Sequence, residues 1–410
     1  MLTITPVDPA LTDKEKAHHV GVDVTNPDQK PSGFKNPWPS FDQSHGGPMS
    51  MLKCRFGHDR PPYAPVPTDR AELVPVVKPD FTPPTAGFKV TWIGHASFLI
   101  QCAPAPEAER GINILCDPVF SERTSPVTFF GPKRYTPTPS TLEELTSAVP
   151  IDLVIISHNH YDHADAATLT YLHQKRGSEI TFIAALNNSR WLTHLSIPHV
   201  QIHEMDWWDS ITLSLHPAPN SSSSSLKLVC TPTQHFSARG AFDRNHDLWC
   251  SYTLHHLPSA KSIYFAGDTA YRSIPINNLT SEQEAEYPAC PAFKTIGDIL
   301  GPFDLALLPI GLCEPRSFMS AVHCNQKDSI EVHRDVKSRR SVGMHWGTVR
   351  GGLSQYYEDV RTPPSRWKEM AEEKGLRWRW DGEDAVGKGR GTEREGWEVG
   401  VLDIGESLVV

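Results

Sequence analysis

The sequence predicts a layered α/β fold in which two β-rich halves face each other and helices cover the outer faces. Apolar, β-branched runs typical of buried strands occur in two successive groups, one between residues 88 and 185 and one between 226 and 345. Helical stretches such as 166–175 and 326–338 separate them. No Gly-x-Gly-x-x-Gly or Gly-x-x-x-x-Gly-Lys-Ser follows a strand, which argues against a Rossmann sheet and a nucleotide cofactor.

The first half reads as five strands in order. FKVTWIGHASFLIQC (88–102) indicates two strands joined by a tight Gly-His turn, and GINILCDPV (111–119) a strand that ends at Asp117. DLVIIS (152–157) is a continuous β-branched run, typical of a strand buried on both faces. EITFIAA (179–185) follows the helical stretch and completes this half.

The second half repeats this texture. Its expected strands lie in LKLVCTPTQH (226–235), LWCSYTLHH (248–256), KSIYFAGDTAY (261–271), FDLALLPIG (303–311) and KSRRSVGMHWGT (337–348). Several of these runs stop at a Gly, Asp or His, so polar side chains follow where apolar strands end.

These residue patterns divide the chain into three regions. Residues 1–85 are rich in proline and form an irregular arm, with residues 1–30 expected to be disordered. A tail and an arm wrapped on the core remain alternatives there, while Phe34, Trp38 and Phe41 favour wrapping beyond residue 30. Residues 86–365 form the central domain that contains both β-rich halves, and residues 366–410 a C-terminal helix and an edge strand packed on the core.

Composition excludes several classes of protein. The formal net charge of -9 gives no global reason to expect nucleic acid. The eight cysteines are scattered without a CxxC pair, which indicates reduced thiols in a cytosol-like compartment. The first 20 residues lack an apolar core and a basic amphipathic pattern, so we expect no secretory or transit signal. A membrane role would be peripheral, because no apolar run approaches about 18 residues.

Imidazoles and carboxylates gather at the strand ends. HNHYDH (158–163) follows DLVIIS, and single candidates follow three later strands: His235, Asp268 and His345. Four strand ends that offer such groups predict a preformed metal site. Donors without cysteine suit zinc, with iron or manganese as alternatives. Asp117, which ends an early strand, is expected to hold the second nitrogen of a metal-binding imidazole.

The number of candidates argues for two ions. Seven donors exceed one tetrahedral site, and paired ions lie about 3.5–4 Å apart in known two-metal sites. A bridging carboxylate is the usual way to hold such a pair, and Asp268 is the natural bridge. The alternative, a chance histidine cluster in a surface loop, does not explain the donors downstream.

These residues carry a family resemblance. HNHYDH matches the HxHxDH signature of the metallo-β-lactamase superfamily, and the chain more narrowly resembles N-acylphosphatidylethanolamine-hydrolysing phospholipase D over about residues 34–350. The matching stretches are NPWPSF, VTWIGHASFLIQ, LCDPVFSERTSPVTFFGPKRYTPTP, SHNHYDHAD, QHFSARGAFDRNHDLWCSY, YFAGDTAY, LLPIG, MSAVHCNQKDSI and MHWGT. Where the family has an acidic Pro-Glu-Glu, this chain has Asn325-Gln326-Lys327-Asp328, which leaves fine substrate preference open.

The resemblance implies a metallo-β-lactamase αββα sandwich with two Zn²⁺ per chain. His158, His160 and His235 would bind one ion, Asp162, His163 and His345 the other, and Asp268 both. Asp162, His323 and Gln234 are expected at the catalytic centre. The resemblance also implies a phospholipid substrate, a peripheral membrane position on the cytosolic face with mitochondria as one option, and a homodimer.

Two apolar segments are candidates for contact with lipid. They carry Phe129 and Phe130 in PVTFFGP and Trp207 and Trp208 in DWWDS, and burial in the core is the alternative for both. Hydrolysis of N-acylphosphatidylethanolamine to N-acylethanolamine and phosphatidic acid is the first hypothesis. A soluble hydrolase of lactones or other small esters is the second, and a protein with a relic site is the third. His95 is expected to be structural, with contact to the site as the alternative.

Overall fold

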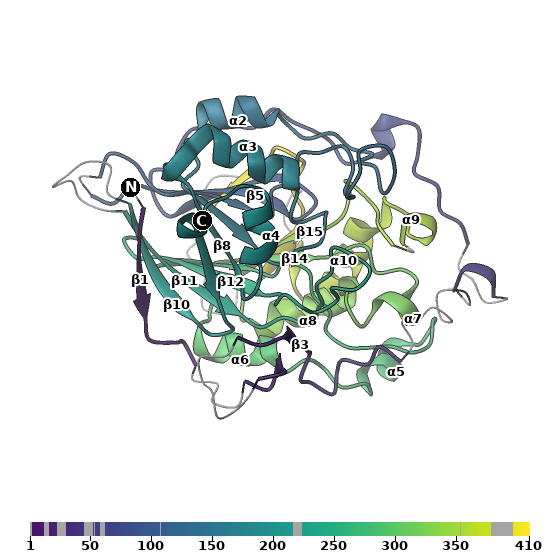
Figure 1. Ribbon diagram of the computed structural model, residues 1–410. Coiled ribbons are helices and arrows are strands. Elements are labelled where there is room, and N and C mark those ends of the chain that lie inside the picture. Colours follow the sequence, from purple (N-terminus) through teal and green to yellow (C-terminus); the bar gives the residue numbers. More distant parts are fainter. Residues whose placement is uncertain are drawn as a thin grey trace.

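Two β-sheets lie face to face in the computed structural model, and helices cover both outer faces (Figure 1). The structure describes residues 2–11, 16–22, 30–44, 52, 54–57, 62–106, 108–215, 224–352, 354–378 and 397–410. The predicted αββα sandwich is confirmed.

The seven-stranded sheet comes from the first half of the chain and one C-terminal strand. Its order is β18 (Ser407–Val409), β4 (Phe88–Gly94), β5 (Ser97–Cys102), β6 (Asn113–Cys116), β7 (Leu153–Ile156), β8 (Thr181–Ala185) and β9 (Ile202–Met205). Strands β6 to β9 run parallel. Leu153 and Ile155 of β7 face the second sheet, while Val154 and Ile156 face the outer helices, so the apolar run is buried on both faces.

The nine-stranded sheet contains most of the second half. Its order is β1 (Leu2–Val7), β10 (Ser210–Leu215), β11 (Ser224–Thr231), β12 (Ser251–His256), β13 (Lys261–Phe265), β14 (Leu305–Pro309), β15 (Arg340–Met344), β17 (Glu398–Gly400) and β16 (Arg377–Trp378). Strands β13, β14 and β15 are parallel, because helices connect them.

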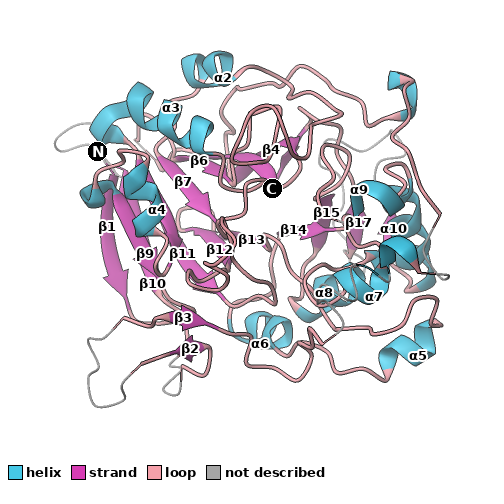
Figure 2. Cartoon of the chain, turned by 45° about the vertical axis from the view of Figure 1, so that its right-hand side comes forward, coloured by secondary structure: helices cyan, strands magenta, loops and turns pink. Residues whose placement is uncertain are grey.

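Helices flank this pair of sheets, as Figure 2 shows. The first half supplies α2 (Leu142–Ala148), α3 (Ala166–Arg176) and α4 (Ser189–His194), whose apolar residues pack on the seven-stranded sheet. The second supplies α5 (Ser281–Ala285), α6 (Ala292–Ile299), α7 (Arg316–Met319), α8 (Gln326–Asp335), α9 (Ser354–Tyr357) and α10 (Thr362–Glu373). The 3₁₀ helices are η1 (Arg70–Glu72), η2 (Gly177–Glu179) and η3 (His199–Gln201), and β2 (His19–Val20) pairs with β3 (Gly33–Phe34).

Both ends of the chain differ from the expectation. Residues 2–7, expected to be disordered, form β1 at the edge of the larger sheet, where Leu2 lies opposite Leu215. That pairing joins residues far apart in sequence, so local composition does not reveal it. Parts of the expected disordered segment, residues 1, 12–15 and 23–29, lie outside the described residues. Near the C-terminus, β16 and β18 are edge strands of the two sheets, as expected for residues 366–410. The edge strand expected near residues 397–404 is instead β17, which lies inside the larger sheet between β15 and β16.

The topology brings strand ends from both sheets together. The carboxyl ends of β6 and β7 lie at one edge of the smaller sheet, and those of β11, β13 and β15 at the matching edge of the larger one. Gly267, just after β13, packs closely against Ser157 at the end of β7: a Cβ there would lie 2.5 Å from the Cβ of Ser157. Its φ of +58° also favours glycine.

Among the described residues, no helix combines the length and the apolar character that crossing a membrane requires.

Burial between the sheets predicts how much the protein is destabilised when a core side chain is shortened. Ile183 on β8 is fully buried between the sheets. We expect Ile183→Ala to destabilise the protein by about 2–5 kcal/mol, because the lost methyl groups leave a void that the sheets only partly close. Thermal unfolding checks this, with Val200→Ala as the control because Val200 is 92% exposed. Equal melting temperatures for the two variants would contradict the assigned interface.

Candidate metal centre

Three imidazoles converge from two strand ends. His158 and His160 follow β7, and His235 follows β11. His158 Nε2 lies 2.9 Å from His160 Nδ1, and His235 Nε2 lies 3.3 Å from the same nitrogen. Nitrogen ligands of one tetrahedral zinc ion are about 3.3 Å apart for bonds of about 2.0–2.1 Å. The spacing of these three nitrogens therefore fits a single ion.

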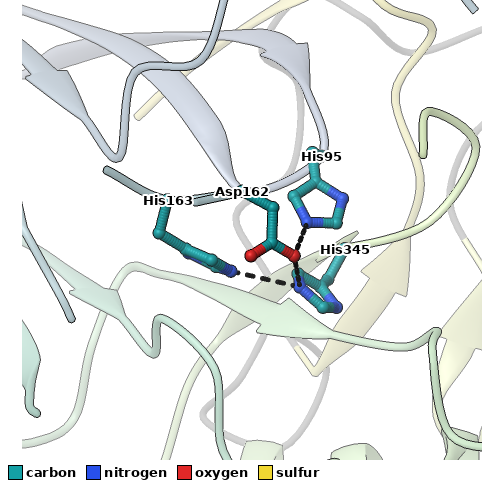
Figure 3. Close-up of side chains that lie close together, drawn as sticks. All are labelled: His95, Asp162, His163 and His345. Carbon is teal, nitrogen blue, oxygen red and sulfur yellow. Dashed lines mark hydrogen bonds and ion pairs between the residues drawn. The ribbon is translucent and has the colours of Figure 1, made fainter. Parts of the chain in front are cut away.

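A second group of donors is drawn in Figure 3 and lies beside the first, since the ring centroids of His158 and His163 are 4.2 Å apart. It contains Asp162, His163 and His345, with His95 at its border. His163 Nε2 is 3.2 Å from His345 Nε2, and His345 Nε2 is 3.9 Å from Asp162 Oδ2. The side chains point toward one another from the loop after β7, the end of β15 and the turn between β4 and β5.

Asp268 stands between the two groups. Its Oδ2 lies 3.2 Å from His163 Nε2, 3.9 Å from His158 Nε2 and 3.8 Å from His235 Nε2. Its Oδ1 lies 2.9 Å from His345 Nε2 but accepts no hydrogen bond from the part of the chain that is described. A buried carboxylate oxygen left in this state favours a cation as its missing partner.

The protein surroundings set the charge of each donor. Burial and neighbouring histidines lower the pKa of His158 well below its usual value, and burial lowers that of His160 to about 4. Burial also lowers the pKa of His235, and Asp268 only partly opposes it. Burial works against the charge of Asp268, yet His163 and His345 hold its pKa well below the usual range.

This donor set fits divalent metal ions. At neutral pH the first group presents neutral imidazoles with free lone pairs, and Asp268 is an anion. His163 differs, because Asp268, Asp117 and Asp162 raise its pKa although burial opposes its charge. A cation at this place would replace the proton that the carboxylates attract to His163. The structure therefore brings the seven predicted ligands together, while their binding of metal stays a prediction.

Asp117 orients two of the imidazoles. Its Oδ2 accepts hydrogen bonds from His163 Nδ1 at 2.7 Å and from Ser157 Oγ at 2.6 Å. Its Oδ1 accepts from the backbone N–H of Ser157 at 2.7 Å. Ser157 Oγ also lies 2.9 Å from His158 Nδ1. Asp117 therefore holds Nδ1 of His163 directly and Nδ1 of His158 through Ser157, so that the Nε2 atom of each ring points into its donor group. This is the role expected for Asp117.

His95 borders the site, which is the alternative to the structural role expected for it. Its Nε2 lies 3.1 Å from Asp162 Oδ2, and its ring centroid lies 4.0 Å from that of His345. Its backbone N–H donates to Thr348 Oγ1, and its carbonyl accepts from the N–H of His345. The φ of His95 is +54°, an uncommon conformation for histidine. The Gly-His turn in the sequence was the available signal.

Gln234 has a structural role, which corrects its expected place among the catalytic groups. Its side chain is fully buried, and its Oε1 accepts a hydrogen bond from Ser40 Oγ at 2.6 Å. Its Nε2 donates to the carbonyls of Ser40 and Ala321. Because protein groups already engage its oxygen and its amide nitrogen, Gln234 anchors the arm beside His235.

His323 reaches the mouth of the site, where its side chain is 11% exposed. Its Nδ1 lies 3.8 Å from Asp268 Oδ2 and has no hydrogen-bond partner among the residues that are described. Burial lowers the pKa of His323 to about 4. The residue is therefore neutral at pH 7 and free to contact a bound molecule.

The proline-rich arm takes part in building the site. Asn36 Nδ2 donates to the carbonyl of His235 at 2.8 Å, and Phe34 is buried in the core. Trp38 stacks on Trp207 with ring centroids 5.3 Å apart. The arm therefore wraps the core at residues 34–41, as its aromatics predict, and fixes the backbone of one candidate ligand.

The two candidate lipid-facing segments behave differently. Trp207 and Trp208 are only 4% and 5% exposed, so the expectation that they meet lipid is wrong. Their turn between β9 and β10 packs beneath the arm, and Trp207 Nε1 donates to the carbonyl of Trp249. Phe129 and Phe130, by contrast, are 82% and 75% exposed.

The role of Asp117 predicts a loss of metal affinity. We expect Asp117→Asn to weaken zinc binding by about 10–100-fold, because an amide nitrogen would face a hydrogen-bond donor. Competition with a chromophoric chelator measures this. Asp298→Asn is the control, since Asp298 is an exposed carboxylate paired with Lys294 and Lys337. Unchanged zinc affinity in Asp117→Asn would show that the carboxylate does not orient the ligands.

Comparisons with known proteins agree with this geometry. Residues 112–346 match the family described as Beta-lactamase superfamily domain. The chain is 33% identical over 279 residues to N-acyl-phosphatidylethanolamine-hydrolyzing phospholipase D 1 of Caenorhabditis elegans, covering 67% of this chain and 68% of that protein. It is 30% identical over 260 residues to the mitochondrial N-acyl-phosphatidylethanolamine-hydrolyzing phospholipase D of Saccharomyces cerevisiae, covering 63% and 47%.

A solved structure, the metallo hydrolase Igni18 from Ignicoccus hospitalis, aligns with 78% of this chain and 97% of its own, at 20% identity and a TM-score of 0.46. The family assignment rests on the sequence matches and not on this likeness. The chain is thus a metal-dependent hydrolase that belongs to the metallo-β-lactamase superfamily and, within it, to the family of N-acyl-phosphatidylethanolamine-hydrolysing phospholipases D.

Proposed function

We propose that this protein is a zinc-dependent phosphodiesterase of phospholipase D type. It would hydrolyse N-acylphosphatidylethanolamine to N-acylethanolamine and phosphatidic acid. The main support is the pair of donor groups that share Asp268, since two adjacent cations suit the charge of a phosphodiester. The 33% identity to a nematode protein of that name supports the choice of substrate.

Two Zn²⁺ per chain fit the donors. His158, His160 and His235 would hold one ion and Asp162, His163 and His345 the other, with Asp268 shared. Bound zinc supplies a water of lowered pKa and positive charge beside the phosphoryl oxygens.

The remaining site residues orient the attacking water and assist proton transfer. His95 Nε2 donates to Asp162 Oδ2, which leaves Oδ1 of Asp162 available to orient the attacking water. Hydrolysis adds the oxygen of that water to phosphorus and breaks the bond to the N-acylethanolamine oxygen, which takes up the proton that the water loses. His323, neutral and at the mouth of the site, would donate a hydrogen bond from its ring N–H to this leaving oxygen and so help to pass it the proton.

Access to a membrane substrate is the next requirement. Phe129 and Phe130 project from the loop between β6 and α2, and Lys133 in the same loop is exposed. Aromatic rings beside a basic side chain suit an interface with anionic phospholipid. We therefore propose that this loop enters the membrane surface while the site takes up the headgroup.

Two variants separate metal binding from proton transfer. Asp268→Ala should lower the zinc content and abolish release of phosphatidic acid, because both donor groups lose their shared carboxylate. His323→Ala should keep both zinc ions yet lower kcat by about 10²–10⁴-fold. Elemental analysis and a lipid product assay on the same samples measure both quantities, and Asp298→Ala is the matched control for loss of a carboxylate.

The proposed substrate fails if the zinc-loaded protein opens lactones but releases no phosphatidic acid from dispersed N-acylphosphatidylethanolamine. The shared role of Asp268 fails if Asp268→Ala keeps full activity.

Removal of the two exposed phenylalanine rings is predicted to weaken membrane binding. Replacement of Phe129 and Phe130 by serine should weaken binding to phosphatidylglycerol vesicles by about 10-fold or more, because two apolar rings no longer leave water. Vesicle cosedimentation measures this. Phe242→Ser is the control, since Phe242 is equally exposed, at 94%, on another loop. An equal loss in the control would mean that general hydrophobicity, rather than this loop, governs binding.

A further inference from the structure

The mouth of the metal site contains an aromatic ring that is not a ligand. Phe236 directly follows His235 and is partly exposed. Its ring centroid lies 4.5 Å from that of His160, in an edge-on arrangement. His160, Asp162 and His323 are the other site residues with partial exposure, so a substrate reaches the metals past this surface.

Arg244 lies on this ring. Its guanidinium carbon is 4.0 Å from the ring centroid of Phe236, and its Nη2 donates to Gln43 Oε1 at 2.7 Å. The ring and the amide hold the guanidinium on two sides, and it is close enough to His160 to contribute to the lowered pKa of that imidazole. Arg244 is nevertheless an exposed residue.

Other arginines around the site already have structural partners. Arg239 donates to the carbonyls of Asn159 and Ala164, within the HNHYDH segment and just after it. Arg134 donates to the carbonyls of Val119 and Ser121. Arg244 makes no ion pair with any carboxylate in the described ranges, and Gln43 is a neutral partner.

The positive charge of Arg244 is only partly compensated by its neighbours. The surrounding protein lowers the pKa of the Arg244 guanidinium through desolvation, and no acidic group opposes the effect. A guanidinium held in place beside a metal site without an anion is poised to take one from a bound molecule.

We propose that Arg244, held by Phe236 and Gln43, binds a phosphate oxygen of the substrate at the mouth of the metal site. This inference rests on the proposed phosphodiesterase function and narrows its substrate class to anionic phosphoesters. Arginine suits the task because its planar fork gives two parallel hydrogen bonds to one phosphate while its face stays on the ring. Arg244 is a binding residue and takes no part in proton transfer.

The same contact predicts a preference among headgroups. Acylation of the ethanolamine nitrogen removes its positive charge, so the diester keeps a net negative charge. A choline headgroup would instead bring a fixed cation close to the guanidinium, which repels it. Arg244 therefore favours N-acylated over zwitterionic phospholipids.

Inorganic phosphate tests the contact without any turnover. Titration calorimetry of the zinc-loaded protein should show phosphate binding that Arg244→Ala weakens by about 10–100-fold. Arg244→Lys should fall between, because it keeps the charge but loses the planar fork. Arg339→Ala, which removes an exposed arginine near the start of β15, should match the wild type within about twofold. Wild-type affinity in Arg244→Ala, or no phosphate binding by the wild type, overturns the inference.

A second experiment distinguishes binding of the lipid headgroup from binding of free phosphate. With dispersed N-acylphosphatidylethanolamine, Arg244→Ala should raise KM by about 10-fold or more and narrow the preference over phosphatidylcholine. If phosphate binding depends on Arg244 but the wild type releases no phosphatidic acid, the phosphate site stands and the proposed lipid function falls. If the wild type cleaves the lipid and KM is unchanged in Arg244→Ala, the contact with the headgroup is refuted.

Discussion

The buried carboxylate of Asp117 is the contact on which the metal centre depends. It accepts hydrogen bonds from the backbone and hydroxyl of Ser157 and from the ring of His163, so it ties the end of β6 to the end of β7 and to the loop beyond. Burial raises the pKa of Asp117, while His163 and Ser157 counteract that rise. The group is stable as an anion only within this set of donors, and the donors are oriented only while the anion is present.

The second constraint is the close approach of the two sheets. Gly267 packs against Ser157, and the N–H of Cys250 donates to the Ser157 carbonyl, so strand ends from both halves meet at one point. Asp268 follows Gly267 and therefore projects between the two groups of imidazoles. A side chain at position 267 would push the sheets apart and move the shared carboxylate away from the ligands it joins.

Much of this arrangement could be predicted from the sequence, because local pattern and strand order carry it. The buried run before His158 and the polar residues after successive strands predict both the sandwich and the edge at which donors meet. Other features depend on contacts between distant residues. Gln234 is a neighbour of His235, yet its bonds to Ser40 and Ala321 reserve it for the arm. The turn that holds Trp207 is apolar enough for a membrane surface, but Trp38 covers it. The Gly-His turn that carries His95 is visible in the sequence, but its contacts with Thr348 and His345, which place it at the site, join residues far apart in the chain.

The hydrogen bond from Asn36 to the carbonyl of His235 changes where the functional unit begins. The matched family region starts at residue 112, and the sequence texture suggests a boundary near residue 86. A protein trimmed to either boundary would keep all seven candidate ligands but lose the arm that holds the backbone of His235 in place. Trimming to residue 112 would also remove His95. The arm is therefore part of the functional unit, as a strand of the sheets is. Substitutions in this proline-rich segment are a way for related chains to change metal affinity without changing a ligand.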